Sequence, residues 1–208
     1  MFIHFQLELF ETIILFLCNL KKAITVQKKY LKLENFLIIA GTNRNEAMSL
    51  AVANIYAQLA ETQGLSSEII DLQQLPADFI DTALYANSGK NSQFNIVRQK
   101  MKEAKKFVFI VPEYNGSFPG VLKAFIDGLE FPATFSGKKC ALVGISAGML
   151  GSSHAMSHLT DIFNYCGMHV LARKPRLTGI SNFFVDGILS NESYNDQLQK
   201  QIKELEIF

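Results

Sequence analysis

The feature of this sequence that most constrains its fold is an alternation, from residue 35 onward, of short apolar runs with longer segments of helical periodicity. Such an alternation predicts an α/β fold, in which a doubly wound parallel sheet has helices on both faces. The expected strands are residues 36–40, 68–72, 107–111, 140–145 and 168–171. The expected helices are residues 49–63, 95–105, 120–130, 153–166 and 192–206.

Length and organisation indicate one domain preceded by an extension. The chain has 208 residues, which fits a single domain of ordinary size. Residues 35–208 contain no repeat, low-complexity tract or Pro/Gly/Ser-rich linker at which a second domain would begin. Residues 75–93 form a long connection, a candidate for a lid or an interface. We therefore divide the chain into an N-terminal extension, 1–34, and an α/β domain, 35–208.

The extension raises the question of a membrane anchor, because residues 2–20 are mostly apolar. A membrane span needs about 20 apolar residues with few or no charges, whereas Glu8 and Glu11 interrupt this stretch. A secretory signal carries its positive charges before the apolar segment, whereas Lys21 and Lys22 follow it. These charges favour an extra helical segment, on the domain or at a subunit contact, or non-native residues added by an upstream start codon.

Composition narrows the partners and the compartment. Lys and Arg number 20 and Asp and Glu number 19, giving a net charge of +1, so no overall positive field favours nucleic acid or an anionic membrane. The three cysteines, Cys18, Cys140 and Cys166, include no Cys-x-x-Cys pair and fit neither a disulfide framework nor a zinc knuckle. We expect a cytoplasmic protein that does not bind nucleic acid.

The loop after the first expected strand has the chemistry of a phosphate site. Ligands of doubly wound sheets bind beyond the carboxyl ends of the strands, and this loop reads Gly-Thr-Asn-Arg-Asn-Glu-Ala-Met-Ser from Gly41. Thr42 and Ser49 supply hydroxyls, Arg44 supplies a guanidinium, and the helix start presents N–H groups. The loop lacks the glycine patterns of a P-loop and of a dinucleotide fingerprint. By itself it is equally typical of a capped helix start with an exposed arginine.

The loop after the third expected strand is more distinctive, with the sequence Pro-Glu-Tyr-Asn-Gly-Ser-Phe-Pro. Pro112 ends strand pairing, and Pro119 begins the next helix. Tyr114, Asn115 and Gly116 combine an aromatic face, an amide and tolerance of positive φ. Such a loop can contact a flat heteroaromatic ring through its backbone N–H groups.

With these loops the chain resembles the NAD(P)H-dependent FMN reductase family, the flavodoxin-like group of small quinone, azo-dye and chromate reductases. The resemblance covers about residue 37 to the C-terminus and rests on three motifs: Pro112-Glu-Tyr-Asn-Gly-Ser with Pro119-Gly, Gly41-Thr-Asn-Arg, and Gly144-Ile-Ser-Ala-Gly. It implies a five-stranded sheet of order 2-1-3-4-5 that binds FMN at the strand ends. It also implies NADPH or NADH as co-substrate, a small-molecule electron acceptor, and a homodimer or homotetramer.

Carried over residue by residue, the resemblance implies a flavin site without a metal or a catalytic side chain, because the cofactor supplies the chemistry. Thr42, Arg44 and Ser49 would contact the phosphate. The isoalloxazine ring and the ribityl chain would be contacted by Pro112, Glu113, Tyr114, Asn115 and Gly116. Ser146 and Gly148 would close the far side of the flavin. The family's first loop usually continues Arg-Pro-Gly-Ser, whereas this chain has Arg-Asn-Glu-Ala. Losing a hydroxyl and gaining the carboxylate of Glu46 predicts weaker retention of FMN.

Other functions compete with this interpretation. The Gly-Ile-Ser-Ala-Gly motif matches a nucleophile elbow with Ser146 as nucleophile, and only Asp161 with His169 follow it in the order that a triad requires. A flavin-binding electron carrier, or a scaffold that has lost flavin, would lack NAD(P)H activity. His154 and His158 have a metal-binding i, i+4 spacing but no evident third ligand.

Overall fold

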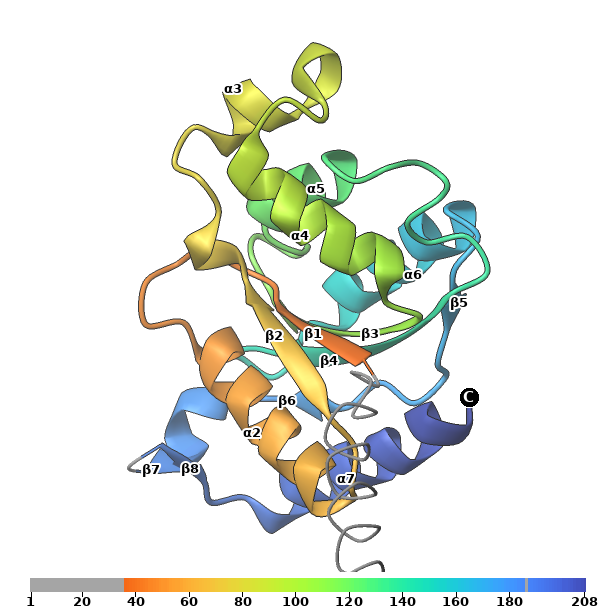
Figure 1. The fold of residues 1–208 in the computed structure, drawn as a ribbon. Helices are drawn as coiled ribbons and strands as arrows, with labels where there is room; N and C mark the ends of the chain where they lie inside the picture. Colours follow the sequence, from red (N-terminus) through yellow and green to blue (C-terminus); the bar gives the residue numbers. More distant parts are fainter. Residues whose placement is uncertain (1–35, 186) are drawn as a thin grey trace, which may run out of the picture. The chain divides into compact units, whose positions relative to one another are not determined.

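The alternation of apolar runs and helical segments forms a parallel sheet with helices on both faces, as Figure 1 shows for the computed structural model. The structure describes residues 36–185 and 187–208; the predicted extension lies outside the described residues. The sheet has the order β2-β1-β3-β4-β5. These strands are β1 Phe36–Ala40, β2 Ser67–Asp71, β3 Lys106–Pro112, β4 Lys139–Ile145 and β5 His169–Val170. Neighbouring strands pair in parallel, which confirms the flavodoxin-like topology.

The sheet has two cores because successive side chains of a strand point to opposite faces. The helices that cover the faces are α2 Met48–Thr62, α4 Ser92–Glu103, α5 Gly120–Asp127, α6 Ser153–Tyr165 and α7 Glu192–Ile207. Leu37 and Phe109 belong to the core under α4, α5 and α6, whereas Ile38 and Ile110 belong to the core under α2 and α7. Figure 1 shows these two groups of helices on opposite sides of the sheet. Burial on both faces explains why the strands are continuous apolar runs.

The prediction of five strands omitted β6, Arg176–Leu177, which also pairs with β4. The edge position beside β4 is divided: β5 pairs with the beginning of β4, and β6 pairs with its end. Between β5 and β6, where the edge strand is interrupted, Gln201 Nε2 donates to the carbonyl oxygens of Leu142, at 2.9 Å, and Arg173, at 2.7 Å. Pro175 interrupts the edge strand because proline has no N–H to donate. A side chain of α7 therefore replaces the missing strand contacts.

The connection predicted for residues 75–93 is ordered by short elements. It contains α3, Phe79–Ala83, and η2, Tyr85–Asn87, and it follows η1, Leu72–Gln74. Phe79 anchors it, because its ring centroid lies 4.7 Å from that of Phe94 in the core. Near the C-terminus, η3 (Ile180–Phe183) leads into a hairpin of β7 (Phe184–Val185) and β8 (Ile188–Leu189). Among the described helices, none has the length and apolar character needed to cross a membrane.

Lysine side chains at the amino edge of the sheet bind the carboxyl ends of two helices. Lys138 Nζ donates to the carbonyl oxygens of Met101 and Lys102, in the last turn of α4, at 3.0 and 2.6 Å. Lys106 Nζ donates to two carbonyl oxygens of the last turn of α7, and Lys139 Nζ donates to the backbone oxygen of Phe208. These contacts satisfy carbonyl groups that a helix end leaves without intrahelical partners.

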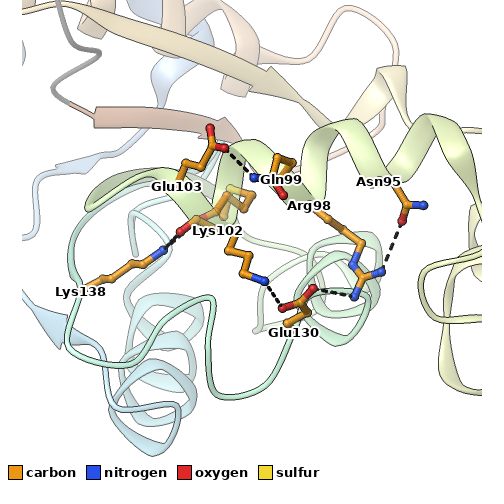
Figure 2. Close-up of polar contacts among 8 residues, drawn as sticks. Asn95, Arg98, Gln99, Lys102, Glu103, Glu130 and Lys138 are labelled. Atoms are coloured by element: carbon orange, nitrogen blue, oxygen red, sulfur yellow. Dashed lines mark hydrogen bonds and ion pairs between the residues drawn. The ribbon is translucent and has the colours of Figure 1, made fainter.

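An ionic cluster ties α4 to the loop that follows α5 (Figure 2). Glu130 lies between two cations of α4: one carboxylate oxygen is 3.6 Å from Arg98, and the other is 2.9 Å from Lys102. Figure 2 also shows Lys138 reaching the end of the same helix. Ion pairs and lysine hydrogen bonds thus join α4 to the neighbouring loops at the amino edge of the sheet.

Candidate flavin-binding site

A cavity of about 460 Å³ opens at the carboxyl ends of β1, β3 and β4. This is where doubly wound sheets bind their ligands. Its lining comes from the loop after β1, the loop after β3, the end of β4 with the residues that follow it, and η3. The lining residues are Thr42, Arg44, Asn45, Glu46, Ala47, Met48, Ser49, Pro112, Glu113, Tyr114, Ile145, Ser146, Ala147, Ile180 and Ser181.

The first wall is the beginning of α2. Ala47 occupies the N-cap position and has no side-chain group that can cap the helix. Ser49 is 1% exposed, and its hydroxyl has no hydrogen-bond partner among the described residues. Arg44, which is exposed, lines the same wall. An anionic phosphate would accept hydrogen bonds from the N–H groups at the start of α2, from the Ser49 hydroxyl and from the Arg44 guanidinium. These donors therefore fit the phosphate of FMN.

Two close contacts shape this wall. Gly41 N donates to the carbonyl oxygen of Ile110 at 2.9 Å, and a Cβ atom at Gly41 would lie only 2.5 Å from that oxygen. The glycine is therefore needed for the close approach of β1 to β3. Thr42 is buried, and its Oγ1 lies 3.0 Å from the hydroxyl of Tyr114. This hydrogen bond joins the phosphate wall to the second wall.

The second wall is the loop after β3, which reverses direction at Asn115 and Gly116. Both residues have positive φ, 51° and 74°. Tyr114 N donates to Ser117 O at 2.7 Å, and Ser117 N donates to Tyr114 O at 3.0 Å. Two central residues of positive φ define the tight turn that Asn-Gly favours. The turn's own hydrogen bonds use the N–H groups of Tyr114 and Ser117, and not those of Asn115 and Gly116.

Neighbouring side chains hold this turn and complete the wall. Ser117 Oγ lies 2.9 Å from Nδ1 of His158 on α6, which attaches the turn to a helix. Glu113 lines the cavity, and its Oε2 atom is buried without a partner among the described residues. A buried polar atom without a partner is costly, so Glu113 offers a second group that a ligand would satisfy.

The third wall is the loop after β4. Ser146 Oγ donates to Gly148 O at 2.8 Å and accepts from Gly151 N at 3.0 Å. The Ser146 hydroxyl thus closes its own loop, and no described histidine contacts it. A hydrolase would need a histidine at hydrogen-bond distance from this oxygen. The geometry therefore disfavours Ser146 as a nucleophile and gives it a structural role in shaping the cavity.

Seven of the ten predicted site residues line the cavity, and the other three, Asn115, Gly116 and Gly148, lie in the turns beside it. Ile180 and Ser181 of η3 also line it, and the sequence patterns did not predict them. They reach the site because β6 returns the chain to the end of β4, and a two-residue strand has no detectable periodicity. The sequence contains one sign of a turn here, Gly179, because glycine tolerates positive φ. In the structure Gly179 has a φ of 53° just before η3.

The other candidate chemistries have less support within the described residues. No group of three or more His, Cys, Asp or Glu side chains is placed there to hold a metal. Burial raises the pKa of the Cys140 thiol and the pKa of the Cys166 thiol above the ordinary cysteine value. Such thiols are protonated at neutral pH and are poor nucleophiles.

Comparisons with known proteins identify the family of this chain. The family model for NADPH-dependent FMN reductase matches residues 35–177. An NAD(P)H-dependent FMN reductase of Pseudomonas aeruginosa is 31% identical over 150 residues, which cover 70% of this chain and 79% of the relative. A 2-hydroxy-1,4-benzoquinone reductase of a Burkholderia species is 29% identical over 67% of this chain and 75% of its own length.

Solved structures agree on the fold. FerB, a flavoenzyme NAD(P)H:(acceptor) oxidoreductase from Paracoccus denitrificans, superposes with a TM-score of 0.69 at 19% identity and covers 84% of this chain and 96% of its own. A flavodoxin from an archaeon gives a TM-score of 0.53 at 14% identity and covers 83% of this chain and 95% of its own. Fold, motifs and family match lead to one conclusion: the chain belongs to the NADPH-dependent FMN reductase family.

Proposed function

We propose that this chain is an NAD(P)H-dependent flavin oxidoreductase that binds FMN and passes electrons to a small-molecule acceptor, such as a quinone, an azo compound or free flavin. One observation carries the proposal. The cavity combines an uncapped start of α2, the guanidinium of Arg44 and the unpaired, buried hydroxyl of Ser49. The names of the relatives, which include FMN, quinone and azo-compound reductases, support the reaction type.

The first wall would bind the phosphate of FMN. Arg44 supplies a charge-assisted hydrogen bond, and the N–H groups at the start of α2 supply further donors. The Ser49 hydroxyl is buried in this wall, so it can donate without first giving up a protein partner. Thr42 positions the wall, because its hydroxyl is bonded both to Tyr114 OH, at 3.0 Å, and to Arg44 N, at 3.3 Å.

The second and third walls would enclose the flavin ring and its ribityl chain. Bound FMN supplies the capacity to take a hydride from NAD(P)H and to pass electrons on. The Asn115–Gly116 turn presents backbone N–H groups that its internal hydrogen bonds do not use, and Glu113 presents a buried acceptor oxygen. Fixed donors and acceptors of this kind orient a ring without reorganisation of the protein. The Ser146–Gly148 loop closes the far side.

We further propose that the protein works in the cytoplasm as a homodimer or homotetramer. Phe131 and Tyr165 are 66% and 81% exposed, and their rings stack with centroids 5.9 Å apart. They line a second cavity of about 460 Å³ between the end of α5 and α6. Exposed aromatic surface of this kind is typical of an interaction surface. Light scattering should give a multiple of the 23.3 kDa chain mass, and the double variant F131S/Y165S should lower it.

An FMN titration followed by flavin fluorescence, and then by anaerobic addition of NADPH and NADH in turn, tests the reductase. Binding at micromolar FMN, with loss of the oxidised flavin colour after one nucleotide, is the expected result. Binding without loss of colour would replace the reductase with a flavin-binding carrier. No binding at hundreds of micromolar FMN would leave only a scaffold that has lost its flavin.

A further inference from the structure

Glu46, an exposed acidic residue, belongs to the same cavity wall as the phosphate-binding groups. It lines the cavity together with Arg44 and Ser49, directly before the start of α2. The positive end of a helix and a guanidinium attract an anion, whereas a carboxylate beside them repels it. Among the described residues neither Arg44 nor Glu46 belongs to an ion pair. Within residues 36–185 and 187–208, the charge of Glu46 therefore has no ion-pair partner.

The backbone fixes Glu46 in this position. Its φ is +51°, in the left-handed region that residues with a Cβ rarely adopt. Asn45 Oδ1 holds the strained residue by accepting hydrogen bonds from Glu46 N and from Gln73 Nε2, each at 3.1 Å. Gln73 belongs to η1, so the loop is tied to the chain that follows β2. The backbone that carries the Glu46 side chain is thus held in a defined turn and is not a free loop.

We propose that Glu46 is a specificity-determining residue, which offsets the attraction of Arg44 and of the α2 N-terminus for a phosphate. The cavity then takes neutral and phosphorylated flavins with similar affinity and exchanges them with solvent. This inference rests on the proposed function, because it concerns the flavin that the same cavity would bind. Glu46 acts only on the charged group of the ligand, so its effect must be absent for riboflavin, which has no phosphate.

Affinities for FMN and riboflavin, measured by fluorescence titration at low ionic strength, test this proposal. In the wild type the two dissociation constants should agree within about three-fold. Glu46→Gln removes the charge and keeps the side-chain length, so FMN should bind about ten-fold more tightly while riboflavin is unchanged. Added salt should weaken FMN binding by the variant more than by the wild type, because the variant's net attraction is stronger and is screened.

Two further variants separate charge from other effects. Glu46→Gly removes both the carboxylate and the strain of the left-handed backbone, so it should match Glu46→Gln in FMN affinity and also raise the melting temperature. Glu103→Gln removes a carboxylate from the end of α4, at the opposite edge of the sheet, and should leave both affinities unchanged. A change in FMN affinity with Glu103→Gln equal to that with Glu46→Gln would reduce the effect to net charge and overturn the proposal.

The remaining outcomes distinguish this inference from the function on which it rests. Wild-type affinity for FMN a hundred-fold above that for riboflavin, or equal FMN affinities of wild type and Glu46→Gln, would overturn the role of Glu46 and leave the flavin site intact. Absence of binding of either flavin to the wild type and to both Glu46 variants would overturn the flavin site as well.

Discussion

Helix ends at the two edges of the sheet differ in their side-chain contacts: the ends of α4 and α7 are bound by lysines, whereas the start of α2 has no side-chain cap. At the amino edge, Lys106, Lys138 and Lys139 donate to backbone oxygens at the ends of α4 and α7. At the carboxyl edge, the start of α2 has an alanine as its N-cap, and the buried Ser49 hydroxyl beside it has no partner among the described residues. Among the described residues, these carbonyl groups at the ends of α4 and α7 therefore have side-chain partners, whereas the start of α2 at the cavity has no side-chain cap.

Under the proposed function, this difference marks the place where the protein gives up stability for binding FMN. Tyr56 and Ser152 also have hydroxyls without a hydrogen-bond partner in the part of the chain that the structure describes, and both side chains are fully buried. A single unpaired atom is therefore weak evidence for a site. A stronger indication of a site is one cavity lined by a hydroxyl without a described partner, a helix start without a side-chain cap and a guanidinium.

The largest expected effect comes from the close approach that forms the cavity edge. Gly41→Ala would place a Cβ 2.5 Å from the carbonyl oxygen of Ile110, a backbone atom that cannot turn away. We expect the free energy of unfolding to fall by about 3 kcal/mol, measured by urea denaturation. Gly120→Ala, at the first position of α5, would meet no atom within 4 Å and should leave stability unchanged or slightly higher. Equal losses in both variants would contradict the role of the close approach.

The sequence was sufficient to predict this part of the fold, because its strands are long and buried on both faces. The observed bounds of β1, Phe36–Ala40, are those predicted, and α2 differs from its prediction by one residue at each end. The loops after β1 and β3 were also identified, because their residues follow directly from strong periodic elements.

The parts that the sequence did not predict depend on tertiary contacts. The strand β6 has two residues and is fixed by pairing with β4, so it has no period of its own. The five-residue helix α3 is too short to be stable alone and is held by the packing of Phe79 on Phe94. Missing β6 led directly to missing Ile180 and Ser181 in the cavity wall.

The next largest effect is expected at the carboxyl edge, where Ser49 lines the cavity. Ser49→Ala removes a buried hydroxyl that has no described partner, so the free energy of unfolding should change by less than about 0.5 kcal/mol. If the hydroxyl instead binds the flavin phosphate, FMN affinity should fall by at least about ten-fold, the value of one hydrogen bond to a charged group. Thermal denaturation without ligand and FMN titration measure the two quantities. A large loss of stability with unchanged FMN affinity would show a structural role for this serine.

A change at the amino edge should lower stability and leave FMN affinity unchanged. Lys138→Met keeps the apolar part of the side chain but loses the two hydrogen bonds to the end of α4. We expect a loss of about 1 kcal/mol in the free energy of unfolding and no change in FMN affinity. Lys105→Met, a change of an exposed lysine next to β3, is the matched control and should have little effect. Loss of FMN affinity in Lys138→Met would contradict the separation of the two edges.

The smallest effect is a dependence on pH. Partial burial lowers the pKa of Lys138 below the ordinary lysine value of 10.5. Between the lowered pKa and 10.5 the unfolded chain therefore binds more protons than the folded protein, so this group's contribution to stability rises with pH across that interval. Denaturation curves of wild type and Lys138→Met at several pH values should show the wild type gaining relative to the variant as pH approaches 10.5. A gap that narrows over the same interval would mean that the capping bonds depend on the charged amine, and that the contact at this edge is chiefly electrostatic.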